Sequence, residues 1–586
     1  MRKNLLVAAA IGVLCLAAPA GAQSDEPQAR RSHDTPPQRI SKSASTSEVQ
    51  EVWVRRVSYF QGLPDEAFDI AVDQAGNVYV TGKVTDTGNK YDYGTAKFDR
   101  EGNMVWGPII ENGHQAYDDE AAAIAVDDAY VYVTGRLADA NGDYAYGTFK
   151  YHRNDGVRVW SRKENGEAGQ PDEAVAIAVD TQGNVYVAGN SFSTARQWSY
   201  KVIKYDHEGN LKWSAFADAD ERSANPDKVF AMVIDAAGDV YLTGIGYADD
   251  AVLDDYLTVK FNGGNGQVIW KELYHDEAED QPVALALGGS GSIYVTGRSK
   301  NAAGDWDYVT IKYSAADGST LKTARHDTRE NDVPRALVVD EAGNVYVTGG
   351  SQHAENNFDY LTIKYNADLE QVWARSYNDP VGNDYDMATD LALDAAGNVY
   401  VTGMSIRSSA QGYDCATVKY DAEGTESWVV RYAGPGEDTP NAITIDKEGN
   451  VYIAGYSEKA PGADRDYLTI KYGQAGTNRV AQPENQPAND YELGQNYPNP
   501  FNPETKFAFA LPQAGEVKLR IYSITGQLVA ALVDGKMAAG RHAISWNGKD
   551  QSGRSVANGV YWYQIIVTDA HGSAAFRQTK KMMLLK

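Results

Sequence analysis

Cysteine is almost absent from this chain, which holds two, Cys15 and Cys415, in 586 residues. Cys15 lies in the apolar N-terminal run described below, so removal of that run leaves Cys415 alone. A single cysteine forms no intramolecular disulfide. Cys415 stands where other repeats have tyrosine, and we interpret it as a small apolar filler.

Positive charge is also scarce. The sequence has 54 Lys and Arg against 80 Asp and Glu, a formal net charge of −26. Such an excess repels phosphate groups, which argues against a nucleic acid or an anionic membrane surface as partner. The charge fits a soluble extracellular protein, a cation-rich setting or a basic partner, and does not choose among them.

Long apolar runs are missing after the N-terminus. Residues 1–22 read as a secretory signal peptide, with "LLVAAAIGVLCLAA" (5–18) as the apolar region and "AGA" (20–22) as the cleavage site. No later run is long enough to span a bilayer, so we expect no transmembrane segment in the mature chain. The polar stretch 23–50 is expected to be a disordered lead-in.

Helical periodicity is missing as well, and a repeat stands in its place. The segment "NVYVTG" or a close variant occurs eight times, with closing glycines 52 to 55 residues apart. A fixed period of this size indicates a solenoid, a propeller or an array. The copies are residues 77–82, 130–135, 184–189, 239–244, 292–297, 344–349, 398–403 and 450–455.

Each repeat divides into four short strands, a to d. Strand a ends in Asp, as in "AFDIAVD" (67–73), and strand b is the "NVYVTG" segment. Strand c is typified by "DYLTIKY" (359–365), and strand d carries Trp, as in "QVWARSY" (371–377). Compact Asp/Gly/Asn turns join a to b and c to d. Four antiparallel strands per unit predict an all-β fold, an eight-bladed β-propeller over residues 51–472.

The chain begins with a strand that has no repeat of its own. "EVWVRRVSY" (51–59) reads as strand d, whereas the eighth repeat reaches Lys471 and Tyr472 and has no strand d. Pairing the two closes the ring and leaves no open sheet edge. An open superhelix is the alternative, but it gives no reason for a strand d at the front of the array.

The pattern "AVDxxGNVYVTG…DYxTIKY…W" resembles the bacterial SBBP-type beta-propeller repeats over about residues 51–472. The resemblance implies the fold and an extracellular setting. It implies no particular reaction or ligand.

A ligand is expected on the face that carries the b–c and d–a loops, because these loops vary while the a–b and c–d turns are nearly identical. One aspartate stands eight positions before the end of strand a in every repeat. These residues are Asp65, Asp119, Asp172, Asp227, Asp280, Asp332, Asp386 and Asp438. An acidic ring suits Ca²⁺, so Ca²⁺ is a possible ligand and no other cofactor is expected. Repetition in every blade favours a structural role instead, in which each Asp ties its d–a turn and pairs with a lysine.

Three further sets of residues recur in the repeats. A strand-c lysine is present in all repeats, a second aspartate opens strand c in six, and aromatic residues stand beside it. The lysines are Lys97, Lys150, Lys204, Lys260, Lys312, Lys364, Lys419 and Lys471. The second aspartates are Asp92, Asp255, Asp307, Asp359, Asp414 and Asp466. Aromatics such as Tyr91, Trp198, Trp306 and Tyr413 suit sugar stacking, but blade packing is favoured. No histidine lies at a repeat-equivalent position beside a metal-spaced neighbour, and no catalytic residue is predicted.

Residues 473–490 read as a linker rich in Pro, Asn and Gln, and alternating runs in 491–586 predict a small β-sandwich. The motifs "NYPNPFNPET" and "GRHAISWNGKDQSGRSVANGVYWYQI" resemble the C-terminal type A sorting domain of the type IX secretion system, which is Ig-like. The resemblance implies Sec export followed by passage across the outer membrane of a Gram-negative bacterium. A plain Ig-like accessory domain is the alternative.

These features together predict a secreted or surface-displayed binding module. Its expected partners are the secretion machinery, through residues 491–586, and an unidentified extracellular glycan or protein. The alternative is an extracellular carbohydrate-active enzyme, a lyase or hydrolase, with its site on the loop face. Near-uniform blades favour binding.

Overall fold

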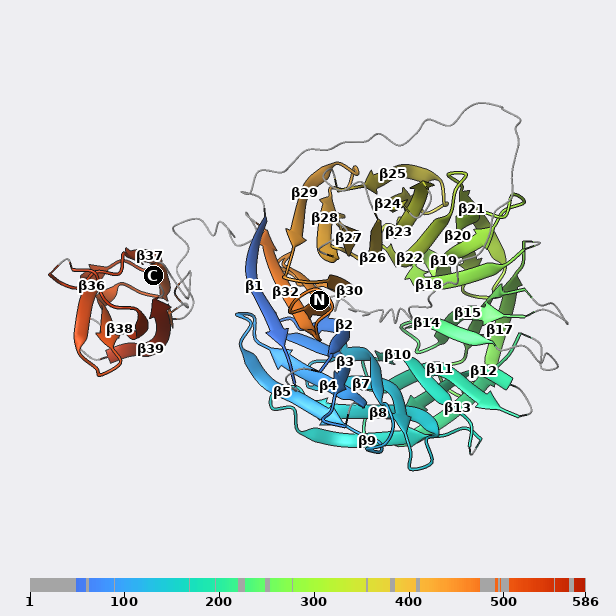
Figure 1. Ribbon diagram of the computed structural model, residues 1–586, viewed down its shortest axis with the longest axis horizontal. Coiled ribbons are helices and arrows are strands. Elements are labelled where there is room, and N and C mark those ends of the chain that lie inside the picture. The colour runs from blue at the N-terminus through green and yellow to red at the C-terminus, as the bar shows by residue number, and fades with distance from the viewer. Residues whose placement is uncertain are drawn as a thin grey trace. The chain divides into compact units, whose positions relative to one another are not determined.

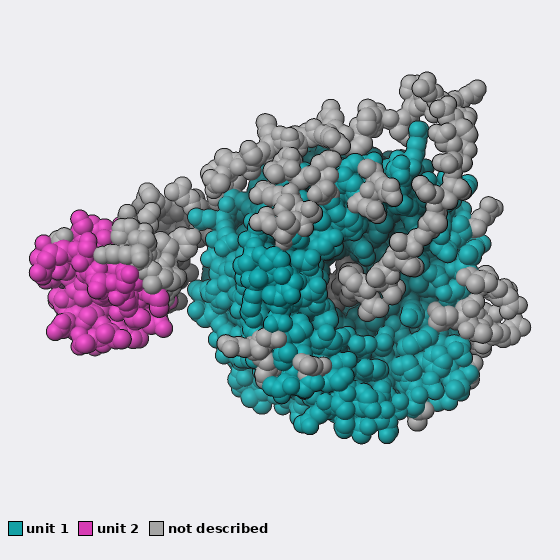
Figure 2. All heavy atoms as spheres, in the orientation of Figure 1, with its two compact units in different colours: residues 1–478 teal, residues 479–586 magenta. Residues whose placement is uncertain are grey.

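The computed structural model divides the chain into two compact units, Met1–Asn478 and Arg479–Lys586 (Figure 2). It describes residues 49–584 except for 60–62, 89, 168, 195–196, 220–226, 248–252, 277, 355–356, 380–384, 407–411, 475–490, 494–495, 497–504, 553 and 569–573. The predicted signal peptide, the lead-in up to residue 48 and most of the linker lie outside the described residues. Within those residues, no helix has the length and apolar character needed to cross a membrane.

Eight four-stranded antiparallel sheets make up the first unit, and in Figure 1 they follow one another around a ring. Seven of them run a-b-c-d in chain order. Blades 1 to 4 are β2–β5 (Glu66–Val72, Val78–Thr85, Tyr91–Phe98, Met104–Glu111), β6–β9 (Glu120–Val126, Tyr130–Ala138, Tyr144–His152, Arg158–Glu164), β10–β13 (Asp172–Val179, Val185–Ser193, Gln197–Tyr205, Leu211–Ala217) and β14–β17 (Lys228–Ile234, Val240–Gly246, Asp255–Phe261, Val268–Tyr274). Blades 5 to 7 are β18–β21 (Asp280–Gly288, Ser292–Lys300, Trp306–Ser314, Thr320–His326), β22–β25 (Asp332–Val339, Val345–Ala354, Asn357–Tyr365, Gln371–Tyr377) and β26–β29 (Asp386–Leu393, Val399–Ile406, Tyr413–Tyr420, Glu426–Tyr432).

The eighth blade takes its outer strand from the other end of the chain. It consists of β30 (Asp438–Ile445), β31 (Val451–Glu458), β32 (Arg465–Gln474) and β1 (Val49–Val57). β1 pairs antiparallel with β32, from Val49 opposite Gln474 to Val57 opposite Tyr467. β30 in turn contacts β2 of blade 1. The predicted eight-bladed propeller closed by an N-terminal strand is therefore confirmed.

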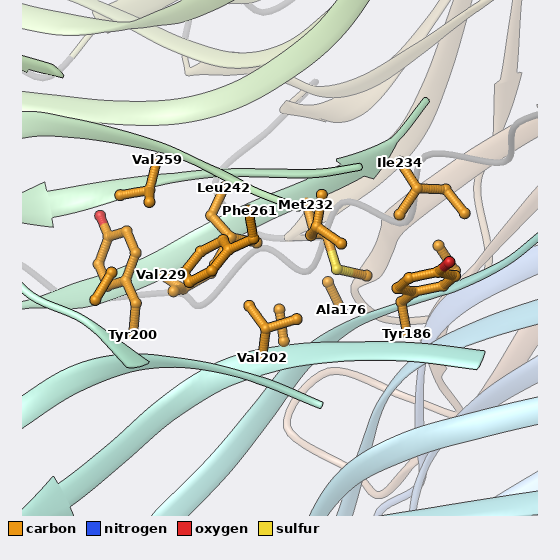
Figure 3. Close-up of a cluster of buried hydrophobic side chains, with 14 of the residues drawn as sticks. Ala176, Tyr186, Tyr200, Val202, Val229, Met232, Ile234, Leu242, Val259 and Phe261 are labelled. Atoms are coloured by element: carbon orange, nitrogen blue, oxygen red, sulfur yellow. The ribbon is translucent and has the colours of Figure 1, made fainter. Parts of the chain in front are cut away.

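The core of this unit lies between blades rather than within them. Strands b and c are buried on both faces because each sheet is covered by two neighbours. Figure 3 shows one such layer, in which Tyr200 and Val202 of blade 3 face Val229, Leu242 and Phe261 of blade 4. Strand d is apolar on one face alone, as the exposed Val372 beside the buried Trp373 illustrates. This pattern follows from its place at the outer edge of the ring.

The strand-d tryptophan and the strand-c lysine of one blade donate hydrogen bonds to the same carbonyl oxygen of the next blade, an arrangement here called the Trp–Lys latch. In blade 6, Nε1 of Trp373 and Nζ of Lys364 lie 3.2 and 2.9 Å from the carbonyl oxygen of Ala422, in the c–d turn of blade 7. The other boundaries with both donors use the carbonyls of Arg100, Arg153, His207, Gly263 and Ala315.

The predicted pairing of the recurring lysines with the recurring aspartates is wrong. Each lysine stands near the end of strand c, beside the c–d turn, whereas each aspartate stands at the start of strand a. Strands a and c run parallel to each other within the sheet, so the two residues lie at opposite ends of the blade. Seven of the ammonium groups instead bind main-chain carbonyls of the next blade, and Lys419 binds Gln474.

The latch also decides which residue the c–d turn can hold. Gly424 has φ +79°, and a Cβ there would lie 2.7 Å from the ring of Trp373 in the preceding blade. Blade 5 carries Lys322 in place of the tryptophan, in the same register. The turn that faces it, in blade 6, holds Leu369 instead of glycine, with φ 56° and its side chain buried. Leu369 packs instead into the apolar layer between blades 5 and 6, against which Ala324 of strand d also packs.

The second unit is a two-sheet sandwich, as predicted. One sheet consists of β33 (Glu492–Leu493), β34 (Thr505–Leu511) and β37 (Gly540–Trp546). The other consists of β36 (Leu528–Met537), β35 (Gly515–Ser523), β38 (Gly559–Thr568) and β39 (Ala574–Leu584). Inward residues of both sheets, among them Phe507, Leu519 and Tyr563, form one apolar core.

Lys322 and Leu369 can be replaced by the Trp and Gly that stand at these positions in other blades. We expect Lys322→Trp alone to overpack the boundary and lower the free energy of unfolding by about 1–3 kcal/mol. Leu369→Gly alone leaves a cavity and costs about 2–5 kcal/mol. The double variant rebuilds the tryptophan site, so its loss is smaller than the sum by about 0.5–3 kcal/mol. Denaturant unfolding of the four proteins measures this coupling, and additive losses would contradict the steric link.

Candidate binding face

The eight predicted aspartates are buried on the loop face, where the b–c and d–a loops lie. In every blade the carboxylate accepts a backbone N–H from the d–a loop that precedes it. In blade 2, Gly113 N lies 2.7 Å from Oδ2 of Asp119, and Ala138 N at the end of β7 donates to Oδ1. The donors to Asp65, Asp172, Asp227, Asp280, Asp332, Asp386 and Asp438 are Tyr59, Gly166, Ala219, Asp276, Thr328, Asp379 and Gly434. Each aspartate therefore closes its d–a loop onto the blade.

Burial raises the pKa of these carboxyl groups. It raises the pKa to about 6 for Asp65, Asp280 and Asp438, and to about 7 for Asp227, Asp332 and Asp386. The pKa values of Asp119 and Asp172 are raised for the same reason. Ca²⁺ takes six to eight oxygen ligands, whereas each of these carboxylates already uses an oxygen to hold its loop. Their contacts are those of loop closure, and Ca²⁺ binding by this set stays a prediction.

The second set of aspartates, at the start of strand c, is buried in the same way but meets a different partner in each blade. Asn112 donates to Asp92 at 2.5 Å, and Arg325 and Arg431 donate to Asp307 and Asp414 at 2.7 and 2.9 Å. The partners of Asp255, Asp359 and Asp466 are His275, His353 and Lys459. The partner lies within strand d or directly after it in four blades, and at the end of strand b or directly after it in the other two. A single side chain therefore changes the chemistry of an otherwise repeated position.

The sequence alone does not single out one histidine that the structure brings beside two carboxylates. Nδ1 of His275 lies 2.7 Å from Oδ1 of Asp255, and these two residues form a compact group with Asp280. In the register of strands c and d, His275 takes the place that Asn112 has in blade 1. The signal was present in the sequence, but it requires the two strands to be aligned residue by residue across blades.

Half-buried aromatic side chains stand at the start of strand c in six blades, and in four of these blades the strand-c aspartate follows directly. They are Tyr91, Tyr144, Trp198, Trp306, Phe358 and Tyr413. Cations cover four of them: Lys83 lies 4.6 Å from the ring of Tyr91, and Arg298 lies 4.3 Å from Trp306. Arg136 and Lys228 stand over Tyr144 and Trp198. Tyr385 packs between Phe358 and Tyr413. The rings are thus held in place and still reach solvent.

Charge is unevenly spread over this face. Glu66 of blade 1 pairs with Lys83 at 3.1 Å and with Arg465 of blade 8 at 2.6 Å, and Glu120 of blade 2 pairs with Arg136 at 3.0 Å. The equivalent a–b pairs in blades 6 and 7 are Val333 with Gly350 and Met387 with Met404. At this a–b position, blades 1 and 2 therefore carry ion pairs, while blades 6 and 7 carry uncharged residues.

Two acidic residues on strand a were not predicted as special. Asp69 and Asp390 directly follow β-bulges of blades 1 and 7, and each accepts the N–H of an isoleucine on the next blade's strand a, at 2.8 and 2.9 Å. Burial raises the pKa of both to about 7. An aspartate inside an apolar strand was the available signal. Their contacts join neighbouring blades.

Cys415 is fully buried, and burial raises the pKa of its thiol to about 12. A thiol in that state is not a nucleophile at neutral pH. This agrees with its interpretation as an apolar filler.

Two families match parts of the chain. The "Beta-propeller repeat" family, SBBP, matches residues 428–459, and the "FlgD Ig-like domain" family matches residues 496–572. The resemblance to SBBP repeats and the Ig-like character of the C-terminal unit are confirmed over these ranges. No curated protein matches the chain.

Solved propellers resemble the chain at low identity. The quinohemoprotein alcohol dehydrogenase ADHIIG of Pseudomonas putida HK5 has 12% identity, with 75% of this chain and 78% of that one covered and a TM-score of 0.46. PorZ, a surface component of the type IX secretion system of Porphyromonas gingivalis, has 14% identity, coverage of 89% and 70%, and a TM-score of 0.38. A PL25 ulvan lyase has 13% identity, coverage of 66% and 97%, and a TM-score of 0.40. None of these likenesses bears on what this chain binds.

The raised pKa of Asp386 predicts a pH dependence of stability. Its folded-state pKa is about 7, above the ordinary value of about 4, so the folded state holds the proton more tightly. The stability from this group is complete below pH ~4 and is lost as the pH rises towards 7. Asp386→Asn should therefore reduce the increase in unfolding free energy between pH 8 and pH 5.

Denaturant unfolding at several pH values measures that slope. The matched control is Asp421→Asn in the exposed c–d turn of blade 7, because blade 6 has Asn366 at the same place and makes the same turn hydrogen bonds with it. An Asp386→Asn slope equal to that of the wild type would show that this carboxyl is ionised throughout the range.

Proposed function

We propose that the protein is an extracellular binding module whose loop face recognises a glycan. The observation that supports this is the set of six half-buried aromatic rings on that face, four of them covered by a Lys or Arg side chain. Aromatic faces stack on the C–H faces of sugars, and the adjoining cations and carboxylates offer hydrogen bonds to hydroxyl groups. On the turn face, the tryptophans of the latch are buried.

The unequal distribution of charge limits the kind of ligand that fits this face. Blades 8, 1 and 2 present both Glu and Arg or Lys side chains in ion pairs, while blades 6 and 7 present the partly exposed Val333 and Met404. A sugar chain with polar and apolar faces suits such a surface better than a small ion does. Rigid blades with fixed rings also lower the entropy lost on binding.

For export, we propose Sec translocation through residues 1–22 and type IX secretion through residues 491–586. The signal-peptide pattern, the "NYPNPFNPET" motif and the Ig-like fold of the C-terminal unit support this route. The mature propeller then resides outside the cell or on the outer surface of a Gram-negative bacterium.

The binding proposal is tested with the mature protein on an array of neutral and acidic glycans and bacterial envelope polysaccharides. For a glycan that binds, Trp306→Ala and Tyr91→Ala should each weaken the Kd about tenfold, which corresponds to about 1.4 kcal/mol. Glu101→Ala and Glu208→Ala, exposed on the turn face, are the matched controls and should leave the Kd unchanged.

A glycan whose Kd responds to the turn-face variants and not to the aromatic ones would place the site elsewhere. Shortened or unsaturated sugar products on incubation would support the carbohydrate-active enzyme instead. Binding of no glycan would overturn the proposed ligand class.

The export proposal predicts a change of compartment. In a Gram-negative host with type IX secretion, deletion of 491–586 should leave the propeller in the periplasm, while the full chain reaches the surface or the medium. Cell fractionation with an antibody against the propeller measures this. Equal secretion of both forms would favour the plain accessory domain.

A further inference from the structure

Three side chains from two blades converge at the boundary between blades 4 and 5. Asp255 opens β16, His275 follows β17, and Asp280 opens β18. One ligand atom from each lies within 4.8 Å of the other two, and Nδ1 of His275 is 2.7 Å from Oδ1 of Asp255. We call this group the blade 4/5 triad. The pairing of strands c and d in blade 4 brings Asp255 and His275 together, and the start of strand a in blade 5 adds Asp280.

Burial makes the two carboxylates good candidates for a cation. Asp255 and Asp280 are both fully buried, while the His275 side chain is 45% exposed. Oδ2 of Asp280 accepts the N–H of Asp276 at 2.8 Å, and the Ser299 side chain on the paired strand donates a further hydrogen bond to this carboxylate. A buried carboxylate oxygen costs free energy unless a donor or a cation meets it. Both donors are neutral, so no Lys or Arg side chain among the described residues balances the negative charge of Asp280.

Other blades of the same chain supply that positive charge themselves. Arg325 in blade 5 and Arg431 in blade 7 stand at the same strand-d register and bind the strand-c aspartates Asp307 and Asp414. At this register blade 4 has Leu273, opposite Leu257. No guanidinium from blade 4 therefore reaches Asp255.

The charged groups packed against the triad are already engaged. Arg325 binds Asp276 and Asp307, and the carboxylate of Asp254 accepts hydrogen bonds from Tyr247 and Gln281. Two carboxylates and a neutral imidazole carry a charge of −2, which a divalent cation balances.

We propose that the blade 4/5 triad binds a divalent transition-metal ion, Zn²⁺ or an ion of similar preference. One imidazole nitrogen and two carboxylate oxygens are ligands that Zn²⁺ accepts, whereas Ca²⁺ prefers a larger set of oxygens. Three protein ligands leave a fourth position, on the exposed side of His275, for water or for a donor atom of a ligand on the loop face.

The test measures Zn²⁺ binding to the metal-stripped mature protein by calorimetry and by thermal unfolding. We expect one Zn²⁺ per chain and a saturable increase in Tm that EDTA reverses, with no increase for Ca²⁺ or Mg²⁺ at the same concentration. His275→Asn copies Asn112 of blade 1, so it preserves a hydrogen bond to Asp255 and should fold normally. It should weaken Zn²⁺ binding at least 100-fold.

His353→Asn is the matched control. His353 also lies on the loop face and its Nδ1 is 3.4 Å from Asp359, but no second carboxylate joins it in a comparable group among the described residues. Its substitution should leave the stoichiometry and Kd unchanged. Equal loss of Zn²⁺ in both variants, or full binding by His275→Asn, would overturn the proposal, as would a wild-type protein that binds no Zn²⁺.

A gain of function tests whether the three ligands suffice. In blade 1, Asp92, Asn112 and Asp119 hold the positions of Asp255, His275 and Asp280. Asn112→His should create a second site and raise the stoichiometry to two Zn²⁺ per chain. A stoichiometry that stays at one would overturn the claim that two carboxylates and one imidazole at these positions form a complete protein ligand set.

Discussion

At six of the eight blade boundaries, one carbonyl oxygen of a c–d turn holds neighbouring blades together on the turn face. A tryptophan and a lysine of the preceding blade both donate to it, and the lysine contributes a charge-assisted hydrogen bond in a half-buried setting. The sequence of a turn is thus determined by the neighbouring blade, which is why Leu369 accompanies Lys322 where the tryptophan is missing. The last boundary needs β1 for the same reason, since β1 brings Trp53 to the carbonyl of Arg100.

This constraint on the turn face leaves the loop face free to vary. A buried aspartate closes each d–a loop from beneath by accepting its backbone N–H, so the rest of the loop can change without loosening the blade. The strand-c aspartate beside it is then available for different partners. Asn112, His275 and Arg325 show three of them on one scaffold.

The fold could be predicted from the sequence because its determinants are local and repeated. Alternating apolar residues, Asp/Gly turns and the spacing from Lys364 to Trp373 define the strands and reveal the missing strand d of the last blade. The partner of Lys97 could not be predicted in this way. It is the backbone oxygen of Arg153, 56 residues away, and a main-chain acceptor leaves no mark in the sequence. His275 likewise resembles any loop histidine until strands c and d are placed in register.

The repeated buried carboxylate on strand c poses the same electrostatic problem in each of six blades, and the chain solves it differently. Beside the neutral amide of Asn112, burial raises the pKa of Asp92 to about 7, so the group takes up a proton near neutrality. Beside Arg325 or Arg431, a permanent positive charge lies within hydrogen-bonding distance. Beside His275, the positive charge that offsets Asp255 comes from a proton on the imidazole or from the proposed metal ion. Because these outcomes differ by one side chain on the blade's outer strand or just after it, new loop chemistry arises without any change to the latch that holds the blades.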